Sequence, residues 1–211
     1  MGTESTEKPV GLRDHRFGGM PLFTAGSLRA FEMGMADIPV LQRFYETNPE
    51  YHLIVGGQAP GPNEARDEFA SQLPAGWPFR KRWMLAFEDD SHSMVGMADV
   101  TSDLFAEGVW HIGLFVVATS LHGRGTARKL YGRLESWMRD NGARWLRLGV
   151  VEGNARAERF WEKSGYVDLR KRHGVEIGKR VCTLRVMAKP LADGELSDYF
   201  AVVARDRPDS A

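Results

Sequence analysis

The sequence predicts an α/β fold: a mixed β-sheet flanked by about four helices. Strand-like runs joined by a short turn in the first half indicate an antiparallel hairpin. Strand and helix patterns alternate in the second half, which is typical of parallel strands joined by a crossover helix. Residues 109–118 are continuously apolar apart from His111, as expected for a central strand covered on both faces. We therefore expect an antiparallel start to the sheet and a parallel pair further along the chain.

The elements of the N-terminal half follow from apolar spacing and from residues that start or stop helices. Apolar residues recur at helical spacing in a first helix, which Pro49 ends. Asn63 is a preferred N-cap for a second helix, whose first turn is acidic. Two strand-like runs then flank the turn Asp89-Asp90-Ser91. The expected elements are strand 28–33, helix 36–47, helix 64–72, strand 82–88 and strand 93–100.

The C-terminal half shows stronger helix patterns. The helix after the central strand has apolar residues at Leu130, Leu134 and Trp137, with Gly142 just past its end. Gly165 closes the next helix in the same way. Two final strands flank a basic connection over residues 170–180. The expected elements are helix 126–141, strand 145–151, helix 154–163, strand 166–169 and strand 181–187.

The chain of 211 residues can bury one sizeable core, so we expect one domain over residues 27–191. Residues 1–26 and 192–211 are polar and are expected to form two loosely held tails. The C-terminal tail contains an apolar patch, residues 199–203. This patch either docks on a partner subunit, in a homodimer, or covers its own domain.

Composition restricts the partners. Lys plus Arg and Asp plus Glu both number 28, so no long-range field favours nucleic acid or an anionic membrane. We see neither a signal peptide nor a membrane-spanning run and expect a cytoplasmic protein. Cys182 is the only cysteine, which excludes an internal disulfide; we expect it to be a buried small hydrophobe, and we expect no metal site.

A glycine-rich turn, His122-Gly123-Arg124-Gly125-Thr126-Ala127, joins the central strand to the following helix. Glycine lets a ligand approach the backbone closely, and the first turn of a helix offers unpaired N–H groups at its positive end. The turn therefore suits a phosphate or diphosphate. The alternative is that the two glycines only make a tight turn.

With this order of elements, residues 28–191 resemble the GCN5-related N-acetyltransferase (GNAT) superfamily. The family signature R/Q-x-x-G-x-G/A corresponds to residues 122–127, with His122 in place of Arg or Gln. A Trp stands where many members have the Tyr proposed to protonate the departing CoA thiolate, and an indole cannot do this. The later pattern N-x-x-A-x-x-x-Y-E-K-x-G-F corresponds to Asn154, Ala157, Trp161, Glu162, Lys163, Gly165 and Tyr166.

The resemblance implies that acetyl-CoA, as co-substrate, lies where strand 109–118 splays from strand 145–151. Phe115 and Val117 would pair with the thioester carbonyl and the pantetheine through their backbone groups. Asn154 would contact the cofactor, cap its helix, or do both. The diphosphate would be held by the turn and the start of its helix, namely Gly123, Arg124, Gly125, Thr126, Ala127 and Arg128.

The acceptor amine must lose a proton, and the resemblance makes His111 the leading general base. The alternative is a structural histidine hydrogen-bonded to the backbone. Tyr51, Tyr131 and Tyr166 are candidate acids, but spacing selects none of them. Because the only cysteine is expected to be inaccessible, we expect direct transfer without an acyl-enzyme.

The expected activity is acetyl transfer from acetyl-CoA to a primary amine of a small molecule. The basic stretch 170–173 favours an acceptor with a carboxylate or phosphate, although such runs are often only solvated surface. A protein or peptide N-acetyltransferase is one alternative. A catalytically inactive acyl-CoA sensor is another, supported by Trp161.

Overall fold

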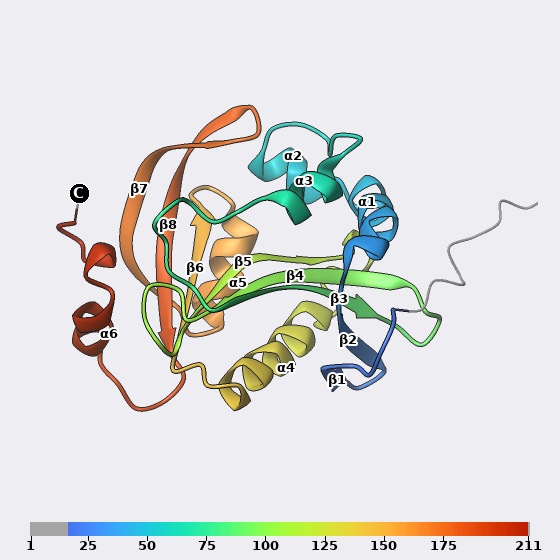
Figure 1. Ribbon diagram of the computed structural model, residues 1–211. Helices are drawn as coiled ribbons and strands as arrows, with labels where there is room; N and C mark the ends of the chain where they lie inside the picture. The colour runs from blue at the N-terminus through green and yellow to red at the C-terminus, as the bar shows by residue number, and fades with distance from the viewer. Residues whose placement is uncertain (1–16, 211) are drawn as a thin grey trace, which may run out of the picture.

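The computed structural model describes residues 17–210 and contains one eight-stranded sheet (Figure 1). The strand order is β1-β2-β3-β4-β5-β6-β8-β7. All neighbouring strands are antiparallel except β5 and β6, which are parallel. The strands are β1 (Phe23–Ala25), β2 (Leu28–Glu32), β3 (Lys81–Glu88), β4 (Met94–Ser102), β5 (Val109–Val117), β6 (Trp145–Val151), β7 (Val167–Ile177) and β8 (Arg180–Pro190).

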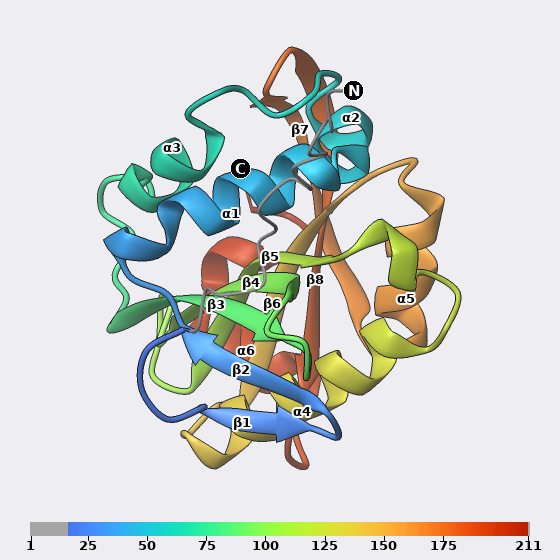
Figure 2. The same cartoon turned by 90° about the vertical axis from the view of Figure 1, so that its right-hand side faces the viewer.

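Helices cover both faces of the sheet. Helices α1 to α3 lie on one face, and α4 and α5 lie on the other (Figures 1 and 2). None of the helices in residues 17–210 is long and apolar enough to cross a membrane. The helices are α1 (Ile38–Thr47), α2 (Glu50–Val55), α3 (Glu64–Ala70), α4 (Thr126–Asp140), α5 (Ala155–Lys163) and α6 (Leu196–Val202), with short 3-10 turns at Met35–Asp37, Thr119–Leu121 and Ala204–Asp206.

The two faces of the sheet form separate apolar clusters because strand side chains alternate in direction. On β4, Ala98 and Val100 belong to the cluster with α4, whereas Met97 packs with α1. Leu130 and Leu134, one turn apart on α4, are both buried in the first cluster. Each such side chain contributes about 1.5–3 kcal/mol through burial. Both faces of the sheet are therefore packed with apolar side chains, so a ligand site requires an opening in this packing.

The expected mixed sheet with one parallel pair is confirmed, and the four expected helices are present as α1, α3, α4 and α5. The described residues contain two further α-helices, α2 and α6, which were not expected. The six residues of α2 are too few to show a clear period. The basic segment 170–180 is mostly strand: β7 and β8 form one long hairpin with two residues between them. One face of this hairpin is exposed and carries charged residues, so the sequence shows no clear strand pattern there.

The C-terminal segment is not a loose tail. Tyr199 of α6 is fully buried, and Val203 packs in the same apolar cluster with β6 and β8. The apolar patch 199–203 therefore covers its own domain. At the other end, Phe17 and β1 of the expected N-terminal tail also pack on the domain, and residues 1–16 lie outside the described residues.

Candidate functional site

The sheet opens between its two parallel strands. Paired positions on β5 and β6 end at Ile112 and Leu148, although the strands continue to Val117 and Val151. Gly113 forms a bulge at this point, since Ile112 and Leu114 pair with successive residues of β4. A bulge bends its strand. The two strands therefore separate, as the resemblance implied.

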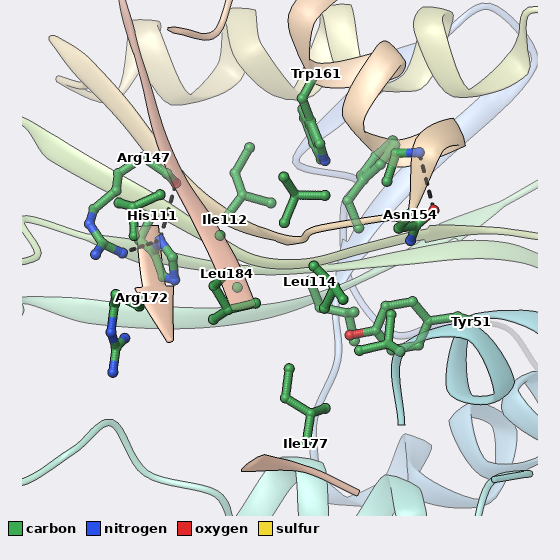
Figure 3. Close-up of a pocket in the computed structure, with 18 of the residues that line it drawn as sticks. Tyr51, His111, Ile112, Leu114, Arg147, Asn154, Trp161, Arg172, Ile177 and Leu184 are labelled. Carbon is green, nitrogen blue, oxygen red and sulfur yellow. Dashed lines mark hydrogen bonds between the residues drawn. The ribbon is translucent and has the colours of Figure 1, made fainter. Parts of the chain in front are cut away.

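A cavity of about 250 Å³ passes through this opening (Figure 3). Its lining comes from both faces of the sheet, with Trp161 of α5 on one side and Tyr51 of α2 on the other. Such a passage can place a long ligand on one face and a second reactant on the other. The described residues that line it include Trp77, His111, Gly113, Phe115, Arg147, Gly149, Asn154, Ala157, Arg172, Ile177, Leu184 and Val186.

The glycine-rich turn has the backbone that an anion site needs. Gly123 and Gly125 have φ of +74° and +77°, and no heavy atom lies within 4 Å of where a Cβ would stand. The first intrahelical bond of α4 is from the N–H of Lys129 to the carbonyl of Gly125. The N–H groups that precede it, on residues 126–128, therefore have no partner in the described structure. Arg124 and Arg128 are exposed beside them.

Backbone groups of β5 face the opening. The N–H of Ala118 donates to Val95 on β4. Because successive residues of a strand point their N–H and C=O groups in opposite directions, Phe115 and Val117 direct theirs toward β6. One of these groups is already used, since Nε2 of His122 donates to the carbonyl of Val117 over 2.9 Å. His122 thus replaces the family's usual residue while tying the turn to the strand.

Two residues of the second motif lie at the same opening. Asn154 is the N-cap of α5, and its Oδ1 accepts from the N–H of Ala157 over 3.3 Å. The capping role is therefore confirmed, and the side chain also lines the cavity. Trp161 is buried and packs edge-on against Phe115 and Tyr131 at centroid distances of 5.9 and 5.3 Å. It forms part of the cavity wall.

One of the three candidate tyrosines lines the cavity, and the cysteine does not. Tyr131 donates to the hydroxyl of Tyr166 over 3.2 Å, and neither lines the cavity. Tyr51 lines it, and burial raises its pKa. The prediction of a buried thiol is wrong: Cys182 is only half-buried, because it lies on the exposed hairpin near the carbonyl of Val55. It does not line the cavity.

His111 lies in the paired part of β5, one residue before the last pair, Ile112 and Leu148. Its Nδ1 lies 3.1 Å from the carbonyl oxygen of Arg147 and 3.4 Å from Nη1 of the same residue; we assign the proton to Nδ1 from the shorter contact, which leaves the lone pair on Nε2. Burial, and then the positive charge of Arg147, lower the pKa of His111 to about 3. The imidazole is therefore neutral at physiological pH.

Arg147 is held by the C-terminal segment. Its Nε and Nη2 donate to the carboxylate of Asp206 over 2.6 and 3.1 Å, and the hydroxyl of Tyr199 donates to the same carboxylate over 2.7 Å. Arg147 and Asp206 are both almost fully buried. Our sequence reasoning missed this arginine, although it interrupts strand 145–151 just as His111 interrupts strand 109–118, and the two are register partners.

A second charged group lies behind Gly113. Asp99 on β4 accepts three hydrogen bonds from Arg82, and its Oδ2 would lie 3.0 Å from a Cβ on Gly113. Glu68 of α3 is bonded to the same arginine. Burial, and then the charge of Asp99, raise the pKa of Glu68 to about 7. A Cβ at position 113 would therefore crowd this carboxylate, which would have to shift slightly.

The cavity is closed on one side by the β7–β8 hairpin, which reaches α2 (Figure 1). The N–H of Lys179 donates to the carbonyl of Gly56 over 2.9 Å, and Arg180 donates to that of Ile54. A Cβ on Gly178 would lie 2.7 Å from the Gly56 oxygen, so this close contact requires glycine. The hairpin and α2 therefore meet at the side of the cavity that is lined by Tyr51 and Ile177.

Comparisons with solved structures show the same fold in N-acetyltransferases. Comparison with curated protein sequences gives no match. Spermidine N-acetyltransferase from Vibrio cholerae, solved with CoA and spermine, has a TM-score of 0.60 at 15% identity over 78% of this chain and 96% of that chain. An acetyltransferase from Thermus thermophilus has a TM-score of 0.58 at 22% identity over 82% and 100% of the two chains. The ribosomal-protein-S18-alanine N-acetyltransferase from Escherichia coli has a TM-score of 0.57 at 15% identity over 80% and 96%.

At these low identities the TM-scores show a shared fold alone, and a sequence model shows the family. The model of the acetyltransferase (GNAT) family matches residues 41–166, more than half of the chain. The matched segment includes the glycine-rich turn, both strands of the opening and the second motif. The chain belongs to the acetyltransferase (GNAT) family.

Proposed function

We propose that the protein transfers an acetyl group from acetyl-CoA directly to a primary amine of a small molecule. The proposal is carried by two observations together: a cavity through the opened β5–β6 pair that is lined by a neutral histidine, and unpaired N–H donors at the start of α4, the helix that follows β5. Acetyl-CoA, when bound, would supply an activated acyl carbon whose C–S bond breaks as the C–N bond forms.

The residues present fit this co-substrate. Backbone N–H groups of residues 123–128 would hold the diphosphate, with charge added by Arg124 and Arg128. Phe115 and Val117 would pair with the pantetheine and orient the thioester carbonyl through backbone groups. Asn154 would contact the same chain of atoms while it caps α5. The apolar ring of Trp161 would exclude water beside the thioester.

His111 would act on the amine. Its free Nε2 accepts a hydrogen bond from a neutral amine and so orients the nitrogen lone pair. With a pKa of about 3, it cannot remove a proton from a free alkylammonium, whose pKa is about 10. It would take the proton only as the nitrogen bonds to the acyl carbon and becomes acidic.

Protonation of the leaving group needs no specialised acid. A thiolate, with a thiol pKa of about 8.5, is a tolerable leaving group near neutrality, so solvent can supply the proton. Tyr51 is the tyrosine that lines the cavity, and its raised pKa makes it a donor of hydrogen bonds more than of protons. Cys182 lies outside the cavity lining, which supports direct transfer without an acyl-enzyme.

A small acceptor is favoured over a peptide. The hairpin contacts α2 through Gly178 and Gly56, so no open groove separates these two elements. An extended peptide would need such a groove on this side of the cavity. The competing function is an acyl-CoA sensor without catalysis, which the Trp161 side chain in the motif's Tyr position favours.

Steady-state thiol release from acetyl-CoA, measured with a panel of primary amines, tests the proposal. We expect release that requires an amine and yields the N-acetyl product in equal amount. Binding of CoA without amine-dependent release would support the sensor. Acetyl-enzyme trapped on Cys182 would contradict direct transfer.

A further inference from the structure

The far end of the cavity is positively charged. Arg147 and Arg172 both line it beside His111 (Figure 3), and none of the lining residues in the described part of the chain is acidic. Two more arginines lie close by: Arg205 stacks on Trp77 at 4.3 Å, and its backbone carbonyl accepts from Arg170 over 2.8 Å. This end therefore gathers four guanidinium groups.

One carboxylate offsets part of this charge. Asp206 is bonded through both oxygens to Arg147, so that guanidinium already has a counterion. The positive charges at this end also act on one another, as Arg205 shows. Burial, followed by the positive charges of Arg147, Arg172 and Arg170, lowers the pKa of Arg205. A negatively charged ligand at this end would relieve that repulsion.

Of the two arginines that line the cavity in the described residues, Arg172 is the one without a carboxylate partner. It is half-buried on β7, and no carboxylate of residues 17–210 pairs with it. Its guanidinium lies 6.0 Å from the Trp77 ring centroid. The neighbouring Lys171 has a different environment, because alternation directs it to the opposite face, where it pairs with Glu152. A planar guanidinium without a partner binds carboxylate or phosphate through two parallel hydrogen bonds.

We propose that the acceptor amine also carries an anionic group, a carboxylate or phosphate, and that Arg172 binds this group in the cavity. The inference rests on the proposed acetyl transfer and specifies its acceptor. Because Arg172 lies beside His111, the amine and the anion would belong to one short molecule; apolar side chains of Ile177, Leu184 and Val186 also line the cavity. A polyamine, which carries only positive charge, is disfavoured.

The anion would also assist His111. Arg147 and Arg172 lie on the same side of the cavity as the imidazole, and the charge of Arg147 lowers the pKa of His111. A bound anion opposes that effect and raises the basicity of Nε2 when the acceptor is present. Binding of the acceptor would thus make His111 a better base for the same acceptor's amine.

The test compares each of a panel of L-amino acids with its amide, O-phosphoethanolamine with ethanolamine, and spermidine as the polycation. Acetyl transfer and equilibrium binding to the CoA-bound protein are both measured, for wild type, Arg172→Gln and Lys171→Gln. We expect at least one anionic amine to exceed its neutral partner about tenfold or more in kcat/KM. Arg172→Gln should lose about 10- to 100-fold for the anionic amine and less than threefold for the neutral one. Lys171→Gln removes the same charge and should leave both unchanged.

Equal kcat/KM for charged and neutral partners, preference for spermidine, or equal losses in Arg172→Gln would overturn the proposal. The amino-acid and phosphate arms show which anion is bound. If CoA binds but no amine is acetylated, the proposed function fails by itself. The binding arm then still decides the inference: anionic amines must bind more weakly to Arg172→Gln than to wild type, and equal binding would refute it.

Discussion

The buried pair of Arg147 and Asp206 gives a sharp prediction about stability. The two side chains are 4% and 2% exposed, and three hydrogen bonds converge on the Asp206 carboxylate, one of them from Tyr199. Asp206→Asn keeps the shape but leaves the arginine charge buried without its counterion. Breaking a buried pair in this way costs about 3–5 kcal/mol. Since domains of this kind are stable by about 5–15 kcal/mol, the loss is a large part of the total.

Urea unfolding at pH 7 measures this loss as a lower midpoint at an unchanged slope. Tyr199→Phe, which removes one hydrogen bond and no charge, should cost about 1–2 kcal/mol. The double variant Arg147→Met/Asp206→Leu should recover much of the loss, because two apolar groups need no counterion. The pKa of Asp206 is lowered mainly by Arg147, so its contribution is complete above pH 3.8 and disappears as pH falls through the lowered value. A loss below 1 kcal/mol for Asp206→Asn would refute the reasoning.

Three other sites give testable predictions. Gly125→Ala places a Cβ at φ +77° and should lower the free energy of unfolding in urea by about 1 kcal/mol. The same variant should weaken CoA binding about tenfold in calorimetry. The control Gly132→Ala, within α4, should raise the free energy of unfolding by about 0.5–1 kcal/mol. Because the pKa of Glu68 in the folded protein is raised to about 7, wild type should lose up to about 3 kcal/mol of unfolding free energy as pH rises from 4.5 to 7. Glu68→Gln should abolish this loss, whereas the control Asp67→Asn should keep it. Parallel pH profiles of wild type and Glu68→Gln would contradict the assignment. His111→Gln should lower kcat about tenfold or more with an unchanged Kd for CoA, and equal kcat/KM at every pH would remove His111 from the mechanism.

The sequence predicted those parts of the fold that have a strong period. The amphipathic spacing of α4 and the apolar run of β5 identified the crossover and the central strand. The β7–β8 hairpin was missed over most of its length, since one face is solvent-exposed and carries Arg, Lys and Glu. Helix α6 was missed because its stability comes from tertiary contacts of Tyr199 and Asp206, which no local pattern reveals.

The candidate site was predictable where it depends on backbone geometry and less so where it depends on distant side chains. The positive φ angles of Gly123 and Gly125 follow from residue type at a strand-to-helix turn. His111 was found because it interrupts an apolar strand. The same argument would have found Arg147, but its pairing with Asp206 joins positions 59 residues apart. Trp77 reaches the cavity from a segment without regular structure, so its role could not be inferred from spacing.

In the proposed function, the opened β5–β6 pair and the start of α4 bind coenzyme A. Calorimetric titration of the purified protein with CoA, and separately with pantetheine, which lacks the diphosphate, tests it most directly. We predict saturable one-to-one binding of CoA, weakened in Gly125→Ala, and binding of pantetheine that is at least about 100-fold weaker. An absence of CoA binding, or equal affinities for the two compounds, would contradict the claim.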